Sequence, residues 1–163
     1  MSVRLVLVRH GLSSFNEKGL VQGRTDYSYL TDKGYEQALK SGEALSGINF
    51  DKIYSSPLVR AAETAKSIKK NLKGENNIIY DKNLLEVDLG SWSGLTINEI
   101  KNKYPEDYLL WENDPENLNL VSIHNSTYQP IKELYEQANE FIKSIFKNYL
   151  EKEEGNILSL IHI

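Results

Sequence analysis

Short apolar runs alternate with longer segments of helical periodicity along the chain, and this alternation restricts the fold more than any other feature. The runs are rich in β-branched and aliphatic residues and too short for helices, so they predict buried strands at residues 3–8, 50–54, 77–80 and 157–161. Apolar residues spaced three and four apart predict helices that begin near residues 31, 57 and 131. Strands that alternate with helices favour an α/β fold of three layers, in which helices flank a mostly parallel sheet.

Local signals mark where two of the helices begin. Ser56 followed by Pro57 supplies an N-cap and then a proline at the first helical position, so a helix is expected from Pro57 onward. Thr96 and Glu99 have the spacing of a capping box, in which each side chain accepts a backbone N–H of the other residue. A further helix is therefore predicted to begin after Thr96.

The chain length bounds the number of domains. At 163 residues it matches one compact domain. Residues 113–129 are polar, interrupted by proline and without a regular apolar period. We therefore predict a single domain over residues 1–163, with a loop or lid insertion at about residues 105–130.

Charge and cysteine content exclude several functional classes. The chain carries 19 basic and 23 acidic residues, a net charge of −4, which disfavours binding to nucleic acid or acidic lipid. It has no cysteine, which excludes disulfide scaffolds and thiolate metal sites. Its first apolar run is short and interrupted by Arg4, and no apolar stretch reaches the roughly 18 residues of a membrane span. We expect a cytoplasmic protein without nucleic-acid or membrane partners.

Polar side chains follow the predicted strands. His10 comes after the first strand and His162 after the last, Arg60 lies in the first turn of the helix after the second strand, and Glu86 follows the third. Because the carboxyl ends of parallel strands meet at one edge of a sheet, these side chains are expected to converge there, together with Arg9. Two imidazoles and two guanidinium groups make a poor apolar core but a good anion pocket.

Such a pocket meets the chemical demands of phosphoryl transfer. Arginines stabilise the charge on the phosphoryl oxygens, and an imidazole with one unprotonated nitrogen can attack phosphorus, a role that we assign to His10. A carboxylic acid must protonate the departing alcohol, and Glu86 is the best-placed candidate. His10, His162 and Glu86 could instead form a two-histidine, one-carboxylate metal site, but neighbouring arginines would repel the cation. We expect no metal site and no other cofactor.

Several motifs resemble those of one known family. The segment Arg9-His10-Gly11-Leu12-Ser13-Ser14-Phe15-Asn16 is similar to the R-H-G-x-[ST]-x-x-N signature of the histidine phosphatase superfamily, the phosphoglycerate mutase-like proteins. Further segments resemble later family motifs, in the family order and over roughly the first 95 residues. These segments are residues 22–26, 30–34, 55–65 and 85–94.

The resemblance implies roles for individual residues. It implies that His10 is the phosphorylated nucleophile and Glu86 the proton donor, and that Arg9, Arg60 and His162 surround the phosphate. It also implies four substrate-binding positions, which are Ser13, Asn16, Gln22 and Gly23.

The motif spacing looks like that of the shorter phosphatase branch of the family. The resemblance therefore implies a phosphomonoester hydrolase that acts on a small phosphorylated metabolite through phosphohistidine. Two alternatives stay open. One is a phosphoglycerate mutase, which would use 2,3-bisphosphoglycerate and return the phosphoryl group to phosphoglycerate. The other is a catalytically weak or inactive phosphate-binding member.

The sequence departs from the family pattern at two places. His124-Asn125-Ser126 stands where the family often has Gly-Glu-Ser, so substrate contacts from that loop are not carried over. After His162 only Ile163 follows, whereas most relatives continue with another helix and strand. We therefore expect a C-terminally truncated version of the fold, with apolar surface exposed near Leu158 and Leu160 that a homodimer could cover.

Overall fold

A four-stranded parallel sheet forms the centre of the molecule. The computed structural model describes residues 2–122, 126–149 and 154–161. The strands lie in the order β1-β6-β2-β3, and every neighbouring pair is parallel. Their bounds are β1 (Ser2–Arg9), β2 (Lys52–Ser55), β3 (Ile78–Tyr80) and β6 (Glu154–Ile161). The prediction of a mostly parallel sheet is confirmed.

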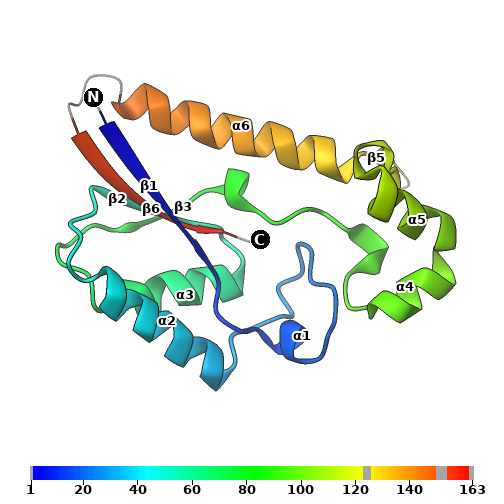
Figure 1. Ribbon diagram of the computed structural model, residues 1–163, viewed down its shortest axis with the longest axis horizontal. Helices are drawn as coiled ribbons and strands as arrows, with labels where there is room; N and C mark the ends of the chain where they lie inside the picture. Colours follow the sequence, from blue (N-terminus) through cyan, green and yellow to red (C-terminus); the bar gives the residue numbers. More distant parts are fainter. Residues whose placement is uncertain (1, 123–125, 150–153, 162–163) are drawn as a thin grey trace.

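Helices cover both faces of this sheet (Figure 1). Helices α2 (Asp32–Leu45) and α3 (Val59–Lys69) lie on one face, and α6 (Pro130–Tyr149) lies on the other. The core on the first side includes Ala65 and Ile68 of α3, and the core on the second side includes Phe141 and Ile145 of α6. Successive residues of a strand point to opposite faces, so β6 contributes Leu158 to the first core and Ile157 to the second. The predicted three-layer α/β architecture is confirmed.

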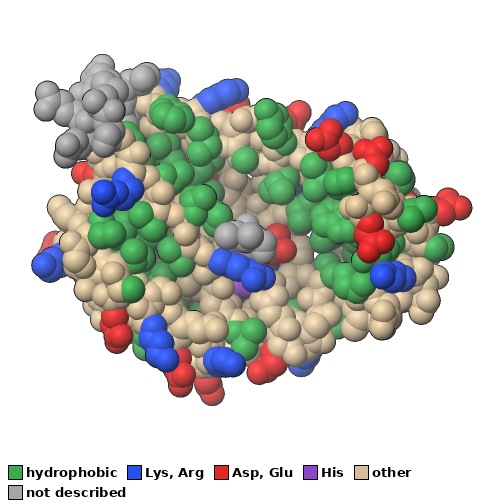
Figure 2. All heavy atoms as spheres, viewed as in Figure 1, with side chains coloured by type: hydrophobic (Ala, Val, Ile, Leu, Met, Phe, Trp, Pro, Cys, Tyr) green, Lys and Arg blue, Asp and Glu red, His purple; other side chains and the backbone are tan. Residues whose placement is uncertain are grey.

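The prediction of exposed apolar surface near Leu158 and Leu160 is wrong. Both side chains have 0% exposure, because β6 lies between β1 and β2 and its leucines pack under α2 and α3. A homodimer therefore has no exposed surface to cover at these two residues. Apolar surface is exposed on the opposite face, where Leu7 of β1 is 53% exposed beside a cavity of about 400 Å³ between β1 and α6. Apolar side chains gather there in Figure 2.

Helix α3 begins two residues later than predicted. Its N-cap is Leu58, which makes no side-chain cap, so Ser56 and Pro57 do not begin the helix. The Val59 N–H donates instead to the carboxylate of Asp26, 3.0 Å away, from a distant loop. By contrast, the predicted capping box is present in α4 (Ile97–Lys103), where local residues are sufficient.

The predicted lid region contains more regular structure than its sequence pattern indicates. Helix α5 (Pro105–Asn113) follows α4 directly, and a hairpin of β4 (Leu120–Val121) and β5 (Thr127–Tyr128) comes after it. No residue of α5 is fully buried, although Tyr108 and Trp111 pack against Trp92, so its apolar face is weak in the sequence pattern. These elements pack around a third apolar core, which includes Trp92 and Ile100.

The remaining elements are short. They are α1 (Ser14–Glu17) and three 3₁₀ helices, η1 (Lys82–Leu84), η2 (Gly90–Trp92) and η3 (Pro115–Asn117). None of the helices in the described part of the chain is long and apolar enough to cross a bilayer.

Candidate active site

His10 lies directly after β1 and is fixed in one tautomer. Its side chain is 6% exposed, and Nδ1 lies 2.7 Å from the carbonyl oxygen of Gly11. A carbonyl oxygen can only accept, so Nδ1 carries the proton and, in the neutral ring, Nε2 carries the lone pair. The backbone N–H of Gly11 in turn donates to the Thr64 hydroxyl of α3 at 3.1 Å. The imidazole is therefore held with its nucleophilic nitrogen defined.

Two glycines allow the loop after His10 to lie against α2. A Cβ on Gly11 would be 2.3 Å from the carbonyl oxygen of Gly34, and a Cβ on Gly34 would be 2.2 Å from the carbonyl oxygen of Leu12. Side chains at either position would collide with backbone that has little freedom to move. This close approach sets the position of the segment that carries His10.

Arg60 lies in the first turn of α3, and its side chain has no solvent exposure. Nη1 donates to the Thr25 carbonyl at 2.8 Å, and Nη2 donates to the Gly23 carbonyl at 2.7 Å and to the Glu86 carboxylate at 2.6 Å. Among the described residues, Nε of Arg60 has no hydrogen-bond partner. A buried, charged N–H group without a partner is costly, and an anionic ligand would satisfy it.

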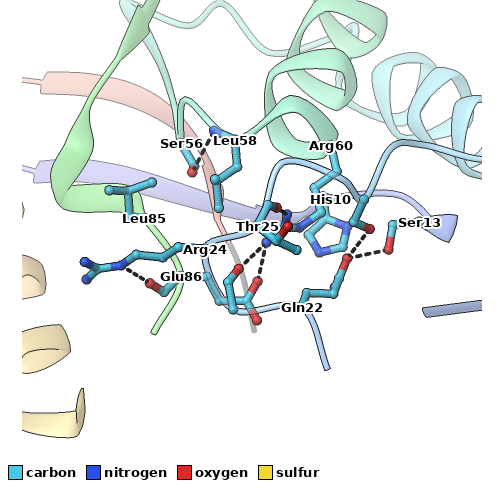
Figure 3. Close-up of polar contacts among 12 residues, drawn as sticks. His10, Ser13, Gln22, Arg24, Thr25, Ser56, Leu58, Arg60, Leu85 and Glu86 are labelled. Atoms are coloured by element: carbon cyan, nitrogen blue, oxygen red, sulfur yellow. Dashed lines mark hydrogen bonds and ion pairs between the residues drawn. The ribbon is translucent and has the colours of Figure 1, made fainter. Parts of the chain in front are cut away.

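Glu86 lies in the segment that follows β3 and η1, and Arg24 holds its backbone. Nε of Arg24 donates to the Glu86 carbonyl at 3.0 Å, and its guanidinium also contacts Gln137 of α6 and, at 3.5 Å, Asp88. Figure 3 shows the Glu86 side chain directed toward Arg60, next to Gln22 and His10. Arg24 therefore holds the backbone of Glu86, and Arg60 holds its carboxylate.

Gln22 belongs to a buried polar network beside His10. Its Oε1 lies 2.6 Å from the Ser13 hydroxyl and 2.7 Å from the Ser28 hydroxyl. The Ser13 hydroxyl also lies 2.8 Å from Oδ1 of Asn16, and it accepts the Asn16 N–H as the N-cap of α1. These contacts connect three of the four substrate-binding positions that the resemblance implied.

Tyr128 connects the hairpin of β4 and β5 to the segment that carries Glu86. Its hydroxyl donates to the Asp88 carbonyl at 3.4 Å. Burial and the nearby Asp88 raise the pKa of Tyr128 to about 12. The phenol therefore stays protonated across the physiological range.

The structure brings together most of the residues that the sequence singled out. Figure 3 draws His10 together with Arg60, Glu86, Ser13 and Gln22. Arg60 is bonded to Glu86 and Gly23, and Ser13 is bonded to Gln22 and Asn16. Arg9 is exposed at the end of β1 and lines a small hollow next to His10. Within the described part of the chain, its side chain makes no hydrogen bond or ion pair. His162, His124 and Asn125 lie outside the described residues.

Sequence reasoning missed the residues that position this site. Thr25 binds Arg60 through its carbonyl, Ser28 binds Gln22, and Asp26 caps α3. Their contacts reach across the fold and leave no periodic signal in the sequence. Arg24, Thr25 and Asp26 did lie in a segment that resembles a family motif, and Arg24 is also one of only four arginines, but neither signal indicated their contacts. In the described residues, no three carboxylate or imidazole groups converge as a metal site.

Comparison with known proteins identifies the family. Residues 5–162 match the model of the histidine phosphatase superfamily (branch 1). The chain belongs to this superfamily. Among relatives, phosphoserine phosphatase 1 of Hydrogenobacter thermophilus is 38% identical over 131 residues, which are 76% of this chain and 60% of the relative. The 2-carboxy-D-arabinitol-1-phosphatase of Triticum aestivum is 34% identical over 159 residues, 98% of this chain but 30% of the relative.

Solved structures of the superfamily have the same fold. The alpha-ribazole phosphatase from Shigella flexneri superimposes with a TM-score of 0.81 at 26% identity, covering 98% of this chain and 73% of the other. Proteins named 2,3-bisphosphoglycerate-dependent phosphoglycerate mutase also match. This histidine phosphatase superfamily chain thus has both phosphatases and mutases among its relatives and spans only part of their length.

Proposed function

We propose that this superfamily member hydrolyses phosphomonoesters of small metabolites through a phosphohistidine at His10. The observation that carries the proposal is the pairing of a histidine in one fixed tautomer with a buried arginine that has an unpartnered N–H group. The fixed tautomer leaves one histidine nitrogen with a lone pair for attack, and the unpartnered N–H group can bind a phosphoryl oxygen.

The phosphate group would bind between Arg60 and Gln22. The Arg60 Nε–H donates to a phosphoryl oxygen, and the Gln22 amide offers further N–H donors beside His10. Arg9 and His162 are proposed as additional phosphate ligands. Arg9 is the last residue of β1, and His162 is the residue after β6 in the sequence, so both come at the carboxyl ends of strands. Hydrogen bonds to a charged group in a water-poor pocket are stronger than those between neutral groups.

The reaction would proceed in two steps. In the first, Nε2 of His10 attacks phosphorus, the bond between phosphorus and the alcohol oxygen breaks, and Glu86 gives its proton to that oxygen. In the second, water attacks phosphorus, the bond between phosphorus and Nε2 of His10 breaks, Glu86 takes a proton from the water, and inorganic phosphate leaves. The negative charge of a phosphate bound next to Glu86 disfavours the ionised carboxylate, which favours protonated Glu86 in the substrate complex.

Turnover of p-nitrophenyl phosphate in the presence of EDTA tests the proposal, including its independence of metal ions. His10→Ala should abolish turnover, and an acid-labile phosphoryl label trapped on the wild-type protein should be missing from the variant. Ser67→Ala, a substitution of a buried serine in α3, serves as the matched control. A loss of less than about tenfold in His10→Ala, equivalent to ~1.4 kcal/mol of barrier, would contradict the assignment.

A mutase is the second candidate, because phosphoglycerate mutases are among the relatives. Such an enzyme would isomerise 3-phosphoglycerate when 2,3-bisphosphoglycerate is present, and it would release little inorganic phosphate. Measuring isomerisation and phosphate release in one reaction separates the two activities. Binding of phosphate or vanadate in calorimetry without either activity would instead indicate a phosphate-binding member.

A further inference from the structure

We infer that Ser28 is a positioning residue that orients the side-chain amide of Gln22, so that its N–H₂ group faces the phosphate beside His10. The inference rests on the proposed function, because it concerns how the phosphate of the substrate is held. Ser28 itself is not expected to touch the substrate.

The first observation is that Ser28 is buried inside an exposed loop. Its side chain has 0% exposure, whereas its neighbours Tyr27 and Tyr29 are 85% and 59% exposed. The hydroxyl turns inward and donates to Oε1 of Gln22 at 2.7 Å. A serine is rarely buried this completely unless its hydroxyl is hydrogen-bonded.

The second observation is that Gln22 uses only one end of its amide within the protein. The side chain is 5% exposed, and both of its recorded side-chain bonds go to Oε1. In the described part of the chain, Nε2 has no hydrogen-bond partner. Two N–H donors are therefore available on Gln22, whose side chain lies near His10 in Figure 3.

Ser28 decides which end of the amide takes this position. Its hydroxyl oxygen accepts the Phe15 N–H at 3.4 Å, and Oε1 of Gln22 is the acceptor recorded for its proton. If the amide turned over, its NH₂ group would face the Ser28 hydroxyl, and the buried proton would lose its acceptor. The Ser13 proton, by contrast, has Oδ1 of Asn16 as an alternative acceptor at 2.8 Å. Ser13 therefore tolerates both orientations of Gln22, and Ser28 tolerates one.

The orientation matters because the two ends of an amide have opposite effects on an anion. The NH₂ end donates hydrogen bonds to phosphoryl oxygens, whereas the carbonyl end repels them. The phosphoryl group is present in both the bound substrate and the transition state, so a loss of orientation should weaken binding of both. The expected signature is a higher KM with little change in kcat.

Steady-state kinetics of Ser28→Ala with p-nitrophenyl phosphate, together with calorimetry of inorganic phosphate, tests the inference. We expect KM and the phosphate dissociation constant to rise about fivefold, the effect of one neutral hydrogen bond, while kcat stays within about twofold. In the Gln22→Ala background, adding Ser28→Ala should change neither constant further, because the effect passes through Gln22. Thermal unfolding checks that both variants fold, and Ser67→Ala is the matched control.

The outcomes separate this inference from the proposed function. Unchanged constants in folded Ser28→Ala, a loss in kcat alone, or an equal effect with and without Gln22 would each overturn the positioning role while the wild type remains active. If the wild type binds phosphate without turnover, the dissociation constants still decide the role. A wild type that neither binds phosphate nor hydrolyses the ester overturns both proposals.

Discussion

The guanidinium of Arg60 and the carboxylate of Glu86 lie 2.6 Å apart, and the arginine side chain is fully buried while the glutamate is 21% exposed. A buried charge is tolerated only when it is paired and hydrogen-bonded, and here the carbonyls of Gly23 and Thr25 complete the pairing. The contacts that let the fold bury Arg60 therefore also place the proposed proton donor next to the proposed phosphate ligand.

Glu86→Gln should slow the release of alkyl alcohols much more than that of nitrophenol. Glutamine keeps the size of the side chain but cannot donate a proton as an acid, a contribution of about 100-fold or more to kcat. Nitrophenolate departs without protonation, so its kcat/KM should fall far less. The ratio of kcat/KM for glycerol phosphate and p-nitrophenyl phosphate measures this, because kcat/KM reports phosphoryl transfer to His10 and excludes the later hydrolysis of phosphohistidine that both substrates share. Equal losses on both substrates would contradict the role of Glu86, and Asp88→Asn should leave the ratio unchanged.

Arg60→Lys should lose activity although it keeps the positive charge. An ammonium group lacks the planar set of donors that reaches two carbonyls, the Glu86 carboxylate and a phosphoryl oxygen at once. We expect kcat/KM to fall by at least ~100-fold, or about 2.7 kcal/mol. Arg4→Lys, at an exposed position of β1, is the control and should behave like the wild type. Activity of Arg60→Lys within tenfold of the wild type would argue against the arginine as phosphate ligand.

Gly34→Ala should destabilise the protein, whereas Gly47→Ala should not. A Cβ at position 34 would lie 2.2 Å from the Leu12 carbonyl oxygen, whereas a Cβ at position 47 meets no atom within 4 Å. Overpacking against backbone costs about 1–3 kcal/mol, and the strain would also displace the segment after His10. Urea unfolding of the two variants measures the difference. Equal stabilities would show that the loop adjusts without cost.

The stability of the protein should fall between pH 10 and pH 12 partly because of Tyr128. Burial and Asp88 raise its pKa from 10.0 to about 12, so in this window the unfolded chain loses a proton that the folded chain keeps. The stabilisation is complete below pH 10 and is lost as the pH rises through the folded value. Urea unfolding at about pH 9 and about pH 11 should show a smaller loss in Tyr128→Phe than in the wild type. Equal losses of stability in the two proteins would show that Tyr128 does not contribute to the fall.

Local and periodic signals were sufficient for the framework of the fold. The apolar runs predicted the strands, and the capping box at Thr96 predicted the start of α4, because both depend on residues close in sequence. The rule that strand ends meet at one edge also placed His10, Arg60 and Glu86 together. The positions of those side chains therefore follow from the strand order, once the strands are known to be parallel.

The tertiary structure alone decided how these side chains are held. Asp26 caps α3 from a loop more than 30 residues away, Thr25 and Gly23 bind Arg60, and Ser28 binds Gln22. The burial of Leu158 was likewise set by the place of β6 in the middle of the sheet. Such contacts depend on how distant segments pack in three dimensions. Periodicity and spacing along the chain reflect only residues close in sequence, so they cannot predict that packing.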